Sequence, residues 1–426
     1  MLDRKFILDN IELVKKNCEN RGVKADVDQF VAVEERRKKL QIQVEELNRQ
    51  ANQVSKSIGQ AKDPAERDAR KEEGRKLREQ TQAAQTEVDA LGVEADRLQR
   101  RIPNLSHPSA PIGVDDQANL ELFCGKTPLP KFDFQPLDHV DLMKKLEMVD
   151  FEAGAQVTGH GFYFLKNDAV LLELALQQYA VHTLLAEGFT PVTTPDLARN
   201  DVLEGIGFIP RGPETQIYSI ENSDMSLVAT AEITLGGMLA GQTLDAESLP
   251  KKFCGISHCF RTEAGAHGRE SRGLYRVHQF TKIEMFAFTL PDDSEAMLEH
   301  LRDLECRLFD GLGVPYRVVD TATGDLGGPA YRKFDLEAWM PGRGDFGEVT
   351  STSNCTDYQA RRLNIRYRVK GEKGTHFVHT LNGTAIAISR GLIAVIENHQ
   401  QADGSIIVPE VLRPWMGKER MGAKNS

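Results

Sequence analysis

Two long stretches of heptad spacing constrain the fold of this chain more than any other feature. Across residues 30–58, apolar residues follow alternating steps of three and four, and only Arg37 departs from the pattern. Residues 77–102 repeat the spacing, with Thr81 as the polar member. So narrow an apolar seam is typical of a two-stranded coiled coil rather than of a helix facing a broad core.

The segment between these stretches has the residues of a helix end and a helix start. Gly59 suits the end of the first helix, and Asp63, Pro64 and Glu66 fit the N-cap, first and third positions of the second. Two helices joined by so short a turn must run antiparallel. With roughly thirty residues in each, they predict an arm on the order of 45 Å long.

The distal part of this arm is basic, although the chain as a whole carries a formal net charge of -10. Residues 49–78 contain nine Lys or Arg and five Asp or Glu. A basic tip on an acidic protein suggests an anionic partner such as an RNA backbone. Ion pairs along a solvated helix surface would explain the same residues equally well.

Composition favours a two-domain protein of the cytosol. The chain has 426 residues, 40% of them hydrophobic, with neither a run of about 18 apolar residues nor an apolar N-terminal segment. Its six cysteines are scattered, as in proteins with reduced thiols. Cys254, His258 and Cys259 match no common zinc spacing, so we interpret them as part of an apolar strand and expect no zinc.

Beyond the arm, the pattern predicts an α+β body. We expect an N-terminal domain over residues 1–107, a Pro/Gly/Asp-rich linker over 108–137 and a larger domain over 138–426. An amphipathic helix is predicted at 170–187. Strands are predicted at 189–194, 218–220, 252–260, 277–289, 316–319, 333–339, 347–351 and 377–381. Many strands with few helices between them indicate an antiparallel sheet. Neither a P-loop nor a dinucleotide-binding glycine motif follows a strand.

The segment 260–286 carries the first candidate site. Arg261 and Glu263 are predicted to share one face of a strand, and Arg269 and Arg272 follow in a glycine-rich loop. Cations on a flexible loop suit a phosphate-bearing ligand. Taken alone, an Arg-x-Glu pair is more often an ordinary surface ion pair.

Acidic residues form the second set of candidates. Glu284 follows Lys282 in an apolar strand, so it must be paired if buried, either in a structural ion pair or in a site. Glu232 precedes a helix-like run at 233–239 and could be simply a helix N-terminal acid. Glu348 heads a strand rich in hydroxyls, over 348–354, that could hold a metal bridging phosphates or be only a polar strand face.

Arg390 is the candidate that physical chemistry singles out most clearly. Residues 380–398 predict a strand, a tight turn and a helix that is apolar all round except for this arginine. Such a helix is buried. A buried arginine needs an anionic partner or ligand.

Taken together, these segments resemble the bacterial-type seryl-tRNA synthetases, a class II aminoacyl-tRNA synthetase family. The resemblance covers nearly the whole chain in the family's order. It runs from a tRNA-binding coiled coil through motif 1 at 190–207 (Pro195 at its proline) and Thr230-Ala231-Glu232 to motif 2 at 260–286, the Glu348 strand, and motif 3 ending at Arg390. It implies a dimer with an antiparallel catalytic sheet flanked by helices. It also implies that serine and ATP form seryl-adenylate before serine passes to serine tRNA.

The resemblance also implies roles for particular residues. The ATP side would comprise Arg261, Thr262, Glu263, Val277, Glu348, Val349, Thr350, Ser351 and Arg390, and among them Arg261, Glu348 and Arg390 would be catalytic. Mg²⁺ would bind through ATP at Glu348 and Ser351. Serine would lie among Thr230, Ala231, Glu232, Arg261, Glu284, Asn382 and Thr384. Arg269 and Arg272 would contact ATP and the tRNA end in turn. Selenocysteine tRNA is also a substrate of this family in hosts that have it.

Two departures from the family pattern affect the pocket. Thr384 stands where the family often has serine, and Val349-Thr350-Ser351 stands where it commonly has Ile-Ser-Ser. Both keep hydroxyls, so we expect activity to survive. A carrier-protein-loading paralogue would lack the arm. A catalytically degenerate RNA-binding paralogue would have lost Arg261, Glu263 or Arg390. A coiled-coil scaffold with an unrelated domain would leave Arg390 unexplained.

Overall fold

The computed structural model describes residues 1–209, 216–264 and 273–422, which form two compact units. The first comprises Met1–Leu105 and the second Ser106–Ser426. The division falls just after the long helices end, where Pro103 cannot continue a helix.

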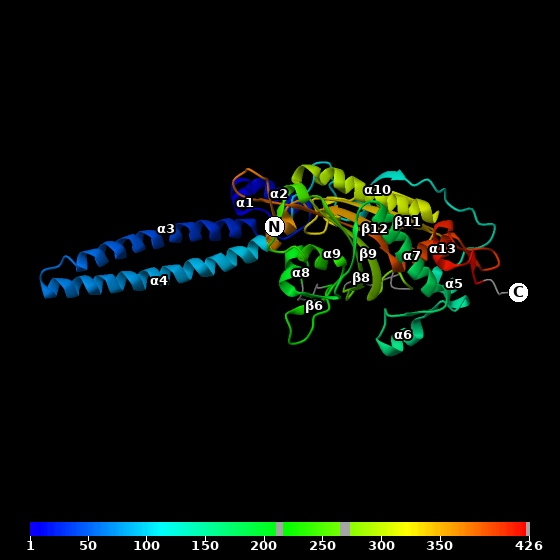
Figure 1. Ribbon diagram of the computed structural model, residues 1–426, viewed down its shortest axis with the longest axis horizontal. Helices are drawn as coiled ribbons and strands as arrows, with labels where there is room; N and C mark the ends of the chain where they lie inside the picture. The colour runs from blue at the N-terminus through cyan, green and yellow to red at the C-terminus, as the bar shows by residue number, and fades with distance from the viewer. Residues whose placement is uncertain (210–215, 265–272, 423–426) are drawn as a thin grey trace. The chain divides into compact units, whose positions relative to one another are not determined.

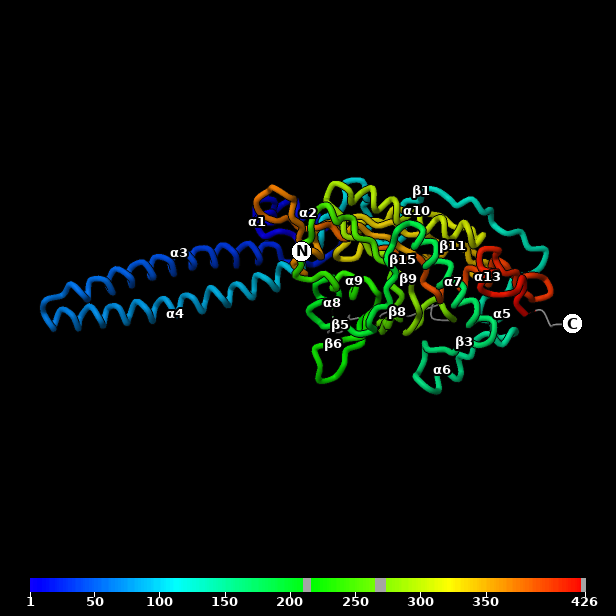
Figure 2. The backbone as a smooth tube through the Cα atoms, in the orientation of Figure 1, coloured from blue at the N-terminus to red at the C-terminus, as the bar shows by residue number. Residues whose placement is uncertain are grey.

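The first unit contains the predicted antiparallel helix pair. It consists of α1 (Arg4–Asp9), α2 (Ile11–Asn20), α3 (Val27–Ile58) and α4 (Pro64–Arg101). The backbone trace in Figure 2 shows α3 and α4 running side by side. Asp63 caps α4 by accepting a hydrogen bond from the Ala65 N–H, and Pro64 opens the helix, as predicted. Heptad residues such as Val44 and Val88 are buried between the helices.

The base of this helix pair belongs to a small globular core. Phe30, Ala95, Leu98 and Ile102 pack with Ile7 and Val14 of the first two helices. Arg4 donates to Glu34 at 2.7 Å and to Gln99 at 2.9 Å, which ties α1 to both long helices. The distal part of the pair, beyond this core, forms the arm.

The second unit is built on an eight-stranded sheet, ordered β1-β10-β11-β12-β15-β9-β8-β4. In that order the strands span Leu120–Cys124, Tyr316–Asp320, Arg332–Met340, Asp345–Asn354, His379–Ala387, Gln279–Thr289, Lys251–Phe260 and Thr190–Thr193. All neighbouring strands are antiparallel except β4 and β8, which run parallel. This confirms the predicted α+β class with an antiparallel sheet.

Two groups of helices cover the sheet (Figure 1). Helices α7 (Asp168–Ala186), α10 (Ser294–Leu312) and α12 (Ile388–Asn398) pack in the larger core. Helices α8 (Asn200–Ile206), α9 (Ala231–Gly237) and α11 (Tyr358–Leu363) pack in a smaller core around Phe286 and Phe288. The other helices are α5 (His139–Lys145), α6 (Phe151–Val157) and α13 (Arg413–Met416).

Short strands complete the unit as small separate sheets. They are β2 (Val149–Asp150) with β3 (Phe164–Leu165), β5 (Leu197–Arg199) with β6 (Met225–Leu227), β7 (Thr243–Asp245) with β13 (Arg366–Arg368) and β14 (His376–Phe377), and β16 (Ile406–Ile407) with β17 (Arg420–Met421). The predicted strand at 218–220 is wrong, because this segment contributes only an isolated bridge between Ser219 and Ser226.

Two further expectations differ from the structure. The stretch 108–137 is not all linker, because β1 within it pairs with β10 as an exposed edge strand. The tight turn predicted between the strand and the helix of 380–398 is wrong, because β15 ends at Ala387 and α12 begins at Ile388. A Cβ at Gly383 would lie 2.9 Å from the Thr352 hydroxyl. This glycine therefore permits close strand packing rather than a turn.

Helix α7 is apolar on more than its buried side. Leu172, Leu176 and Leu184 lie in the core, whereas Leu171 and Leu174 are exposed, so the helix is less amphipathic than predicted. By length and composition alone it could cross a membrane, and it is the one such helix among the described residues. The core helix of a globular protein meets the same criterion, and α7 contributes to the larger core.

Candidate active site

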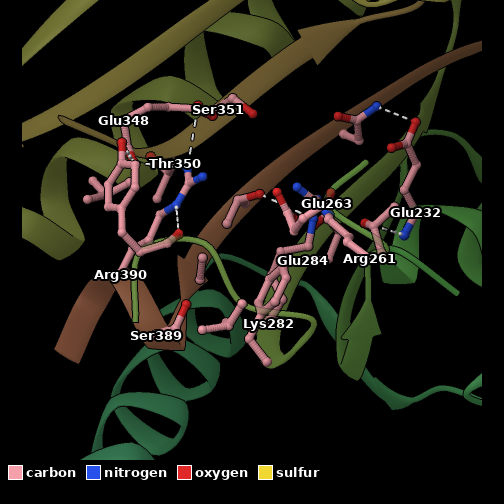
Figure 3. A pocket seen from close by; sticks show the side chains of 18 of the residues that line it. Glu232, Arg261, Glu263, Lys282, Glu284, Glu348, Thr350, Ser351, Ser389 and Arg390 are labelled. Carbon is pink, nitrogen blue, oxygen red and sulfur yellow. Dashed lines mark hydrogen bonds and ion pairs between the residues drawn. The ribbon is translucent and has the colours of Figure 1, made fainter. Parts of the chain in front are cut away.

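One polar pocket lies over the middle of the large sheet, where β9, β12 and β15 meet the end of β8 and the start of α12. Figure 3 shows Glu348 and Arg390 at one end of it and Glu232 at the other. Arg261 and Glu284 lie between these ends. The two ends differ in chemistry, and each is built by different elements.

Arg390 organises the first end. It is the third residue of α12, which follows β15 with no loop between them. Its guanidinium Nη1 donates to the Glu348 carbonyl at 2.9 Å and lies 3.4 Å from a Glu348 carboxylate oxygen. The guanidinium also stacks over Tyr275, 4.6 Å from the ring centroid. The anionic partner expected for a buried arginine is thus Glu348.

Glu348 remains an anion because of the cations around it. Its place in the pocket wall removes water and disfavours the charge. Arg390, Lys333 and Arg261 outweigh that effect and hold the pKa of Glu348 below its usual value. Its side chain is 42% exposed, so this carboxylate can still meet a ligand.

Arg261 and Glu263 lie beyond a strand rather than on one. Strand β8 ends at Phe260, and Glu263 has a positive φ of 50°. The prediction that both share a strand face is therefore wrong, although both line the pocket. Arg261 stacks over Phe280 at 5.3 Å from the ring centroid. Within the described residues it forms no ion pair, and Glu263 pairs with Arg276 at 3.7 Å.

Glu232 forms the other end, in the first turn of α9 as the sequence predicts. Thr230 caps this helix by accepting from the Glu232 N–H. The Glu232 carboxylate accepts from the Asn382 amide at 2.8 Å and from the Gln359 amide at 2.7 Å. Burial, together with the charge of Glu284, raises the pKa of Glu232 to about 7.

Glu284 lies between the two ends, almost fully buried in a direct ion pair with Lys282 on the same strand. Lys282 also lies 3.4 Å from the Thr384 hydroxyl. Burial raises the pKa of Glu284, although Lys282 and Arg261 oppose the rise. Glu284 therefore takes part in an ion pair and also lines the pocket.

The structure brings most of the predicted site residues together. Lining the pocket are Thr230, Glu232, Arg261, Glu263, Val277, Glu284, Glu348, Val349, Thr350, Ser351, Asn382, Thr384 and Arg390. Thr262 and Ala231 do not line it: Thr262 pairs through its backbone with Gln216, and Ala231 is fully buried in α9. Arg269 and Arg272 lie outside the described residues.

Sequence reasoning missed several pocket residues, namely Phe208, Tyr275, Phe280, Lys282, Ala387 and Ser389. Phe280, Lys282 and Glu284 alternate along β9 and therefore share one face. Counting back from Glu284 in steps of two along this strand would have identified Lys282 and Phe280 as pocket residues. Tyr275 gives no comparable signal, because it precedes the strand.

The described residues contain no cluster of three or more His, Cys, Asp or Glu side chains placed to hold a metal ion. Glu348 and Ser351 offer a carboxylate and a hydroxyl on the pocket wall. Oxygen donors of this kind suit Mg²⁺, which usually binds through one or two carboxylates and substrate phosphates.

Comparisons with known proteins agree over the whole chain. The family model for the seryl-tRNA synthetase N-terminal domain matches residues 1–106, and that for the tRNA synthetase class II core domain (G, H, P, S and T) matches residues 217–399. A serine–tRNA ligase of Rhodopirellula baltica is 64% identical over 98% of both chains. One from Rubrobacter xylanophilus is 54% identical over 99% of both.

Solved structures agree with these relatives. The crystal structure of seryl-tRNA synthetase from Pyrococcus horikoshii complexed with ATP superposes with a TM-score of 0.93 at 38% identity, over 99% of each chain. The cytoplasmic serine–tRNA ligase of Naegleria fowleri, in complex with AMP, gives a TM-score of 0.85 at 33% identity, over 98% of this chain and 96% of its own.

Proposed function

The chain belongs to the seryl-tRNA synthetase family, and from this premise we propose that its pocket holds serine at the Glu232 end and ATP at the Arg390 end. As a serine–tRNA ligase it activates serine with ATP and transfers the serine to tRNA. One observation carries the assignment of the two ends. Arg390 lies at one end and Arg261 between the ends, where cations can meet phosphates, whereas Glu232 with the Asn382 amide lies at the other end.

Arg261 and Arg390 neutralise phosphate charge, Arg261 between the two ends at the α-phosphate and Arg390 at the ATP end on the far phosphates. Arg261 suits this role because it has no ion pair among the described residues and is held only by Phe280 and a 3.4 Å contact to the Ala229 carbonyl. Glu263, Val277, Val349 and Thr350 line the ATP side. Thr262 is assigned here by resemblance alone.

Mg²⁺ is proposed at Glu348 and Ser351, where the oxygen donors fit it. Glu348 is anionic because of the cations around it, which suits a divalent ion. When bound there, the ion would supply positive charge that offsets the charge of the phosphates.

At the serine end, the α-ammonium group of the substrate pairs with Glu232, and the side-chain hydroxyl is recognised by Glu284 and Thr384. Thr230 and Asn382 complete this end, and Ala231 supports it from behind as part of α9. A site that pairs a substrate hydroxyl rejects analogues lacking it by roughly 10⁴–10⁵-fold.

The chemistry requires no activated side chain. An oxygen of the serine carboxylate forms a bond to the α-phosphorus while the bond to the pyrophosphate oxygen breaks. The protein contributes by aligning two anions and by neutralising the charge that builds up at phosphorus. Arg261 lies between the two ends, where that charge develops.

The arm is proposed to bind serine tRNA outside the pocket. On its distal part, five cations form no ion pair within the described residues and so remain available to phosphates: Lys56, Lys62, Arg67, Lys76 and Arg78. By contrast, Arg70, Lys71 and Arg75 are already paired with acidic residues along the helix. Arg269 and Arg272 are assigned to the tRNA acceptor end by resemblance, and selenocysteine tRNA is a further candidate substrate.

We further propose a homodimer and a cytoplasmic location. Exposed leucines on α7 give the second unit an apolar surface that a second copy could cover. Translation uses charged tRNA in the cytoplasm, and the Naegleria fowleri relative is described as cytoplasmic. We assign tRNA binding to residues 1–107 and catalysis to residues 138–426, with the edge strand β1 of the intervening stretch completing the catalytic sheet.

The decisive experiment is amino-acid-dependent ATP–pyrophosphate exchange with each of the twenty amino acids, without tRNA. We expect exchange with serine alone. Exchange with serine that survives replacement of both Glu232 and Arg390 would contradict the assignment of the two pocket ends. Retention of Arg261, Glu263 and Arg390 in one pocket argues against a catalytically degenerate protein.

A further inference from the structure

A buried glutamine outside the pocket, Gln359, forms a hydrogen bond to Glu232 at the serine end. It lies in α11, is fully inaccessible to solvent and belongs to none of the motifs in the sequence. Its amide nitrogen donates to the Glu232 carboxylate oxygen Oε1 at 2.7 Å and to the Ile206 carbonyl at 3.1 Å. Both amide hydrogens therefore have fixed acceptors.

The orientation of this amide is fixed by a third contact. The Thr380 hydroxyl, on β15, donates to the Gln359 carbonyl oxygen at 2.7 Å. Thr380 is also fully buried. Reversing the amide would place an N–H against the hydroxyl and a carbonyl oxygen against the Glu232 carboxylate. The network therefore specifies that Gln359 donates to Glu232.

The same carboxylate oxygen receives both amide donors. Asn382 donates to Oε1 at 2.8 Å, beside the Gln359 donor. Glu232 Oε2 forms no hydrogen bond within the described residues, and Glu232 keeps partial exposure in the pocket. Two donors on one oxygen fix the carboxylate plane and leave the other oxygen for a ligand.

We propose that Gln359 is a positioning residue for serine, which keeps Glu232 ionised and turned so that Oε2 receives the substrate ammonium group. The proposal rests on the assignment of Glu232 to the serine ammonium. Gln359 does not touch the substrate itself. It acts through Glu232, and Thr380 sets the direction of its hydrogen bond.

The charges that face Glu232 show why such a donor matters. Burial and the Glu284 carboxylate on β9 disfavour the anion, whereas Gln359, Lys282 on β9 and Arg261 after β8 favour it. With a pKa of about 7, Glu232 is close to half-protonated under ordinary conditions. A protonated Glu232 cannot pair with an ammonium group. Loss of the Gln359 donor therefore lowers the fraction of Glu232 that is ionised near neutral pH.

The test is Gln359→Met, a neutral side chain of similar length that cannot donate. In pyrophosphate exchange we expect KM for serine to rise about tenfold near neutral pH, with KM for ATP unchanged. The acid limb of kcat/KM for serine should move to higher pH. The ratio of wild-type to variant kcat/KM for serine should therefore decrease as the pH rises from about 6 to about 8.5.

Gln400→Met is the matched control. Gln400 is also a buried glutamine, and its amide binds the Leu137 backbone and the Glu397 carbonyl, which are not part of the pocket lining. It should lower thermal stability without moving the pH profile. The proposal would be overturned if Gln359→Met lowered kcat/KM for serine equally at all pH values, or if it raised KM for serine and KM for ATP equally.

Glu232→Gln separates this inference from the proposed function. If Glu232→Gln leaves KM for serine unchanged, the assignment of the serine ammonium is wrong and the inference fails with it. If Glu232→Gln raises that KM and Gln359→Met does not, the proposed function stands and only the role of Gln359 is refuted.

Discussion

Arg390 is largely buried, whereas its carboxylate partner Glu348 is about half exposed. This difference in exposure indicates that the arginine is fixed in place while the carboxylate can still meet a ligand. Its side chain is 17% exposed, compared with 42% for Glu348. The arginine is held by the Glu348 and Tyr275 carbonyls and by the Tyr275 ring. Its position is therefore set before any ligand arrives, which is the condition for electrostatic preorganisation.

Arg390→Ala should lower the rate of serine-dependent pyrophosphate exchange by at least about 10²-fold, because no other cation is placed at that end by the same helix. Arg390→Lys should restore part of the rate but not the contact with the Tyr275 carbonyl. Exchange would be the measurement, with circular dichroism to show that both variants fold. Normal exchange in Arg390→Ala would refute the assigned role.

Glu305 offers a prediction about stability rather than catalysis. This residue of α10 is 1% exposed, and neither carboxylate oxygen has a hydrogen-bond partner in the described part of the chain. Burial, with Asp335, Glu284 and Glu348 nearby, raises its pKa well above the usual value. Folding therefore favours the protonated form of Glu305 relative to the unfolded chain.

Glu305→Gln should therefore stabilise the protein, and increasingly so as the pH rises. Folding takes up a proton at Glu305 above the ordinary pKa of a glutamate, so wild-type stability falls as pH rises through the window between the unfolded and folded pKa values. The variant lacks this pH-dependent loss, so its free energy of unfolding relative to wild type should rise with pH. Urea titrations at several pH values would measure it; a difference that does not depend on pH would contradict the explanation.

Among the elements, the end of α3 at Gly59 and the start of α4 at Asp63 and Pro64 agree with the sequence prediction. A strict heptad seam and a clear N-cap are local signals, and they determined both helices without knowledge of the rest of the chain. Strand β15 was harder. The sequence predicts a tight turn after it, but β15 passes directly into α12, and Gly383 serves the close approach of β12, which only the tertiary structure reveals.

The site shows the same contrast. Charged residues in apolar surroundings, such as Arg390 and Glu284, stand out in the sequence because an uncompensated buried charge is so costly. Gln359 does not, because glutamine is unremarkable in any helix and its importance depends on meeting Glu232, 127 positions away in the sequence. The pattern along the chain cannot report contacts of that range.

Shortening the arm should separate the two steps of the reaction. We expect removal of residues 41–83, with Leu40 joined to Ala84 by a short flexible turn, to spare pyrophosphate exchange and to weaken tRNA charging sharply. The cut preserves Phe30, Ala95 and Leu98 in the core of the first unit. Equal charging by the shortened and full-length proteins would show that the arm does not bind tRNA.

A milder variant tests the charge of the arm without changing its length. Replacing Lys56, Lys62, Arg67, Lys76 and Arg78 by glutamine should weaken tRNA binding and reduce its dependence on salt, since fewer counterions are released. Lys71→Gln is a suitable control, because Lys71 is already paired with Asp68 at 2.9 Å. A salt dependence identical to that of wild type would argue against phosphate contacts by these residues.

At the scale of the whole molecule, the exposed side of α7 makes an assembly testable. Leu171 and Leu174 are 40% and 53% exposed on a helix whose other side lies in the core. If a second copy covers them, Leu171→Glu with Leu174→Glu should convert dimer to monomer in sedimentation experiments. Val93→Glu, at a more exposed apolar residue of α4, is the control. A wild-type monomer would refute the dimer.

The direct passage from β15 into α12 has a consequence for how this gene can change. Asn382 and Thr384 serve one end of the pocket and Arg390 the other, and all three belong to one continuous strand and helix. One residue inserted between Ala387 and Arg390 would turn the arginine by about 100° around the helix axis and move it by about 1.5 Å. Substitutions can tune this segment, but its length is fixed, so insertions and deletions should be absent from its functional variants.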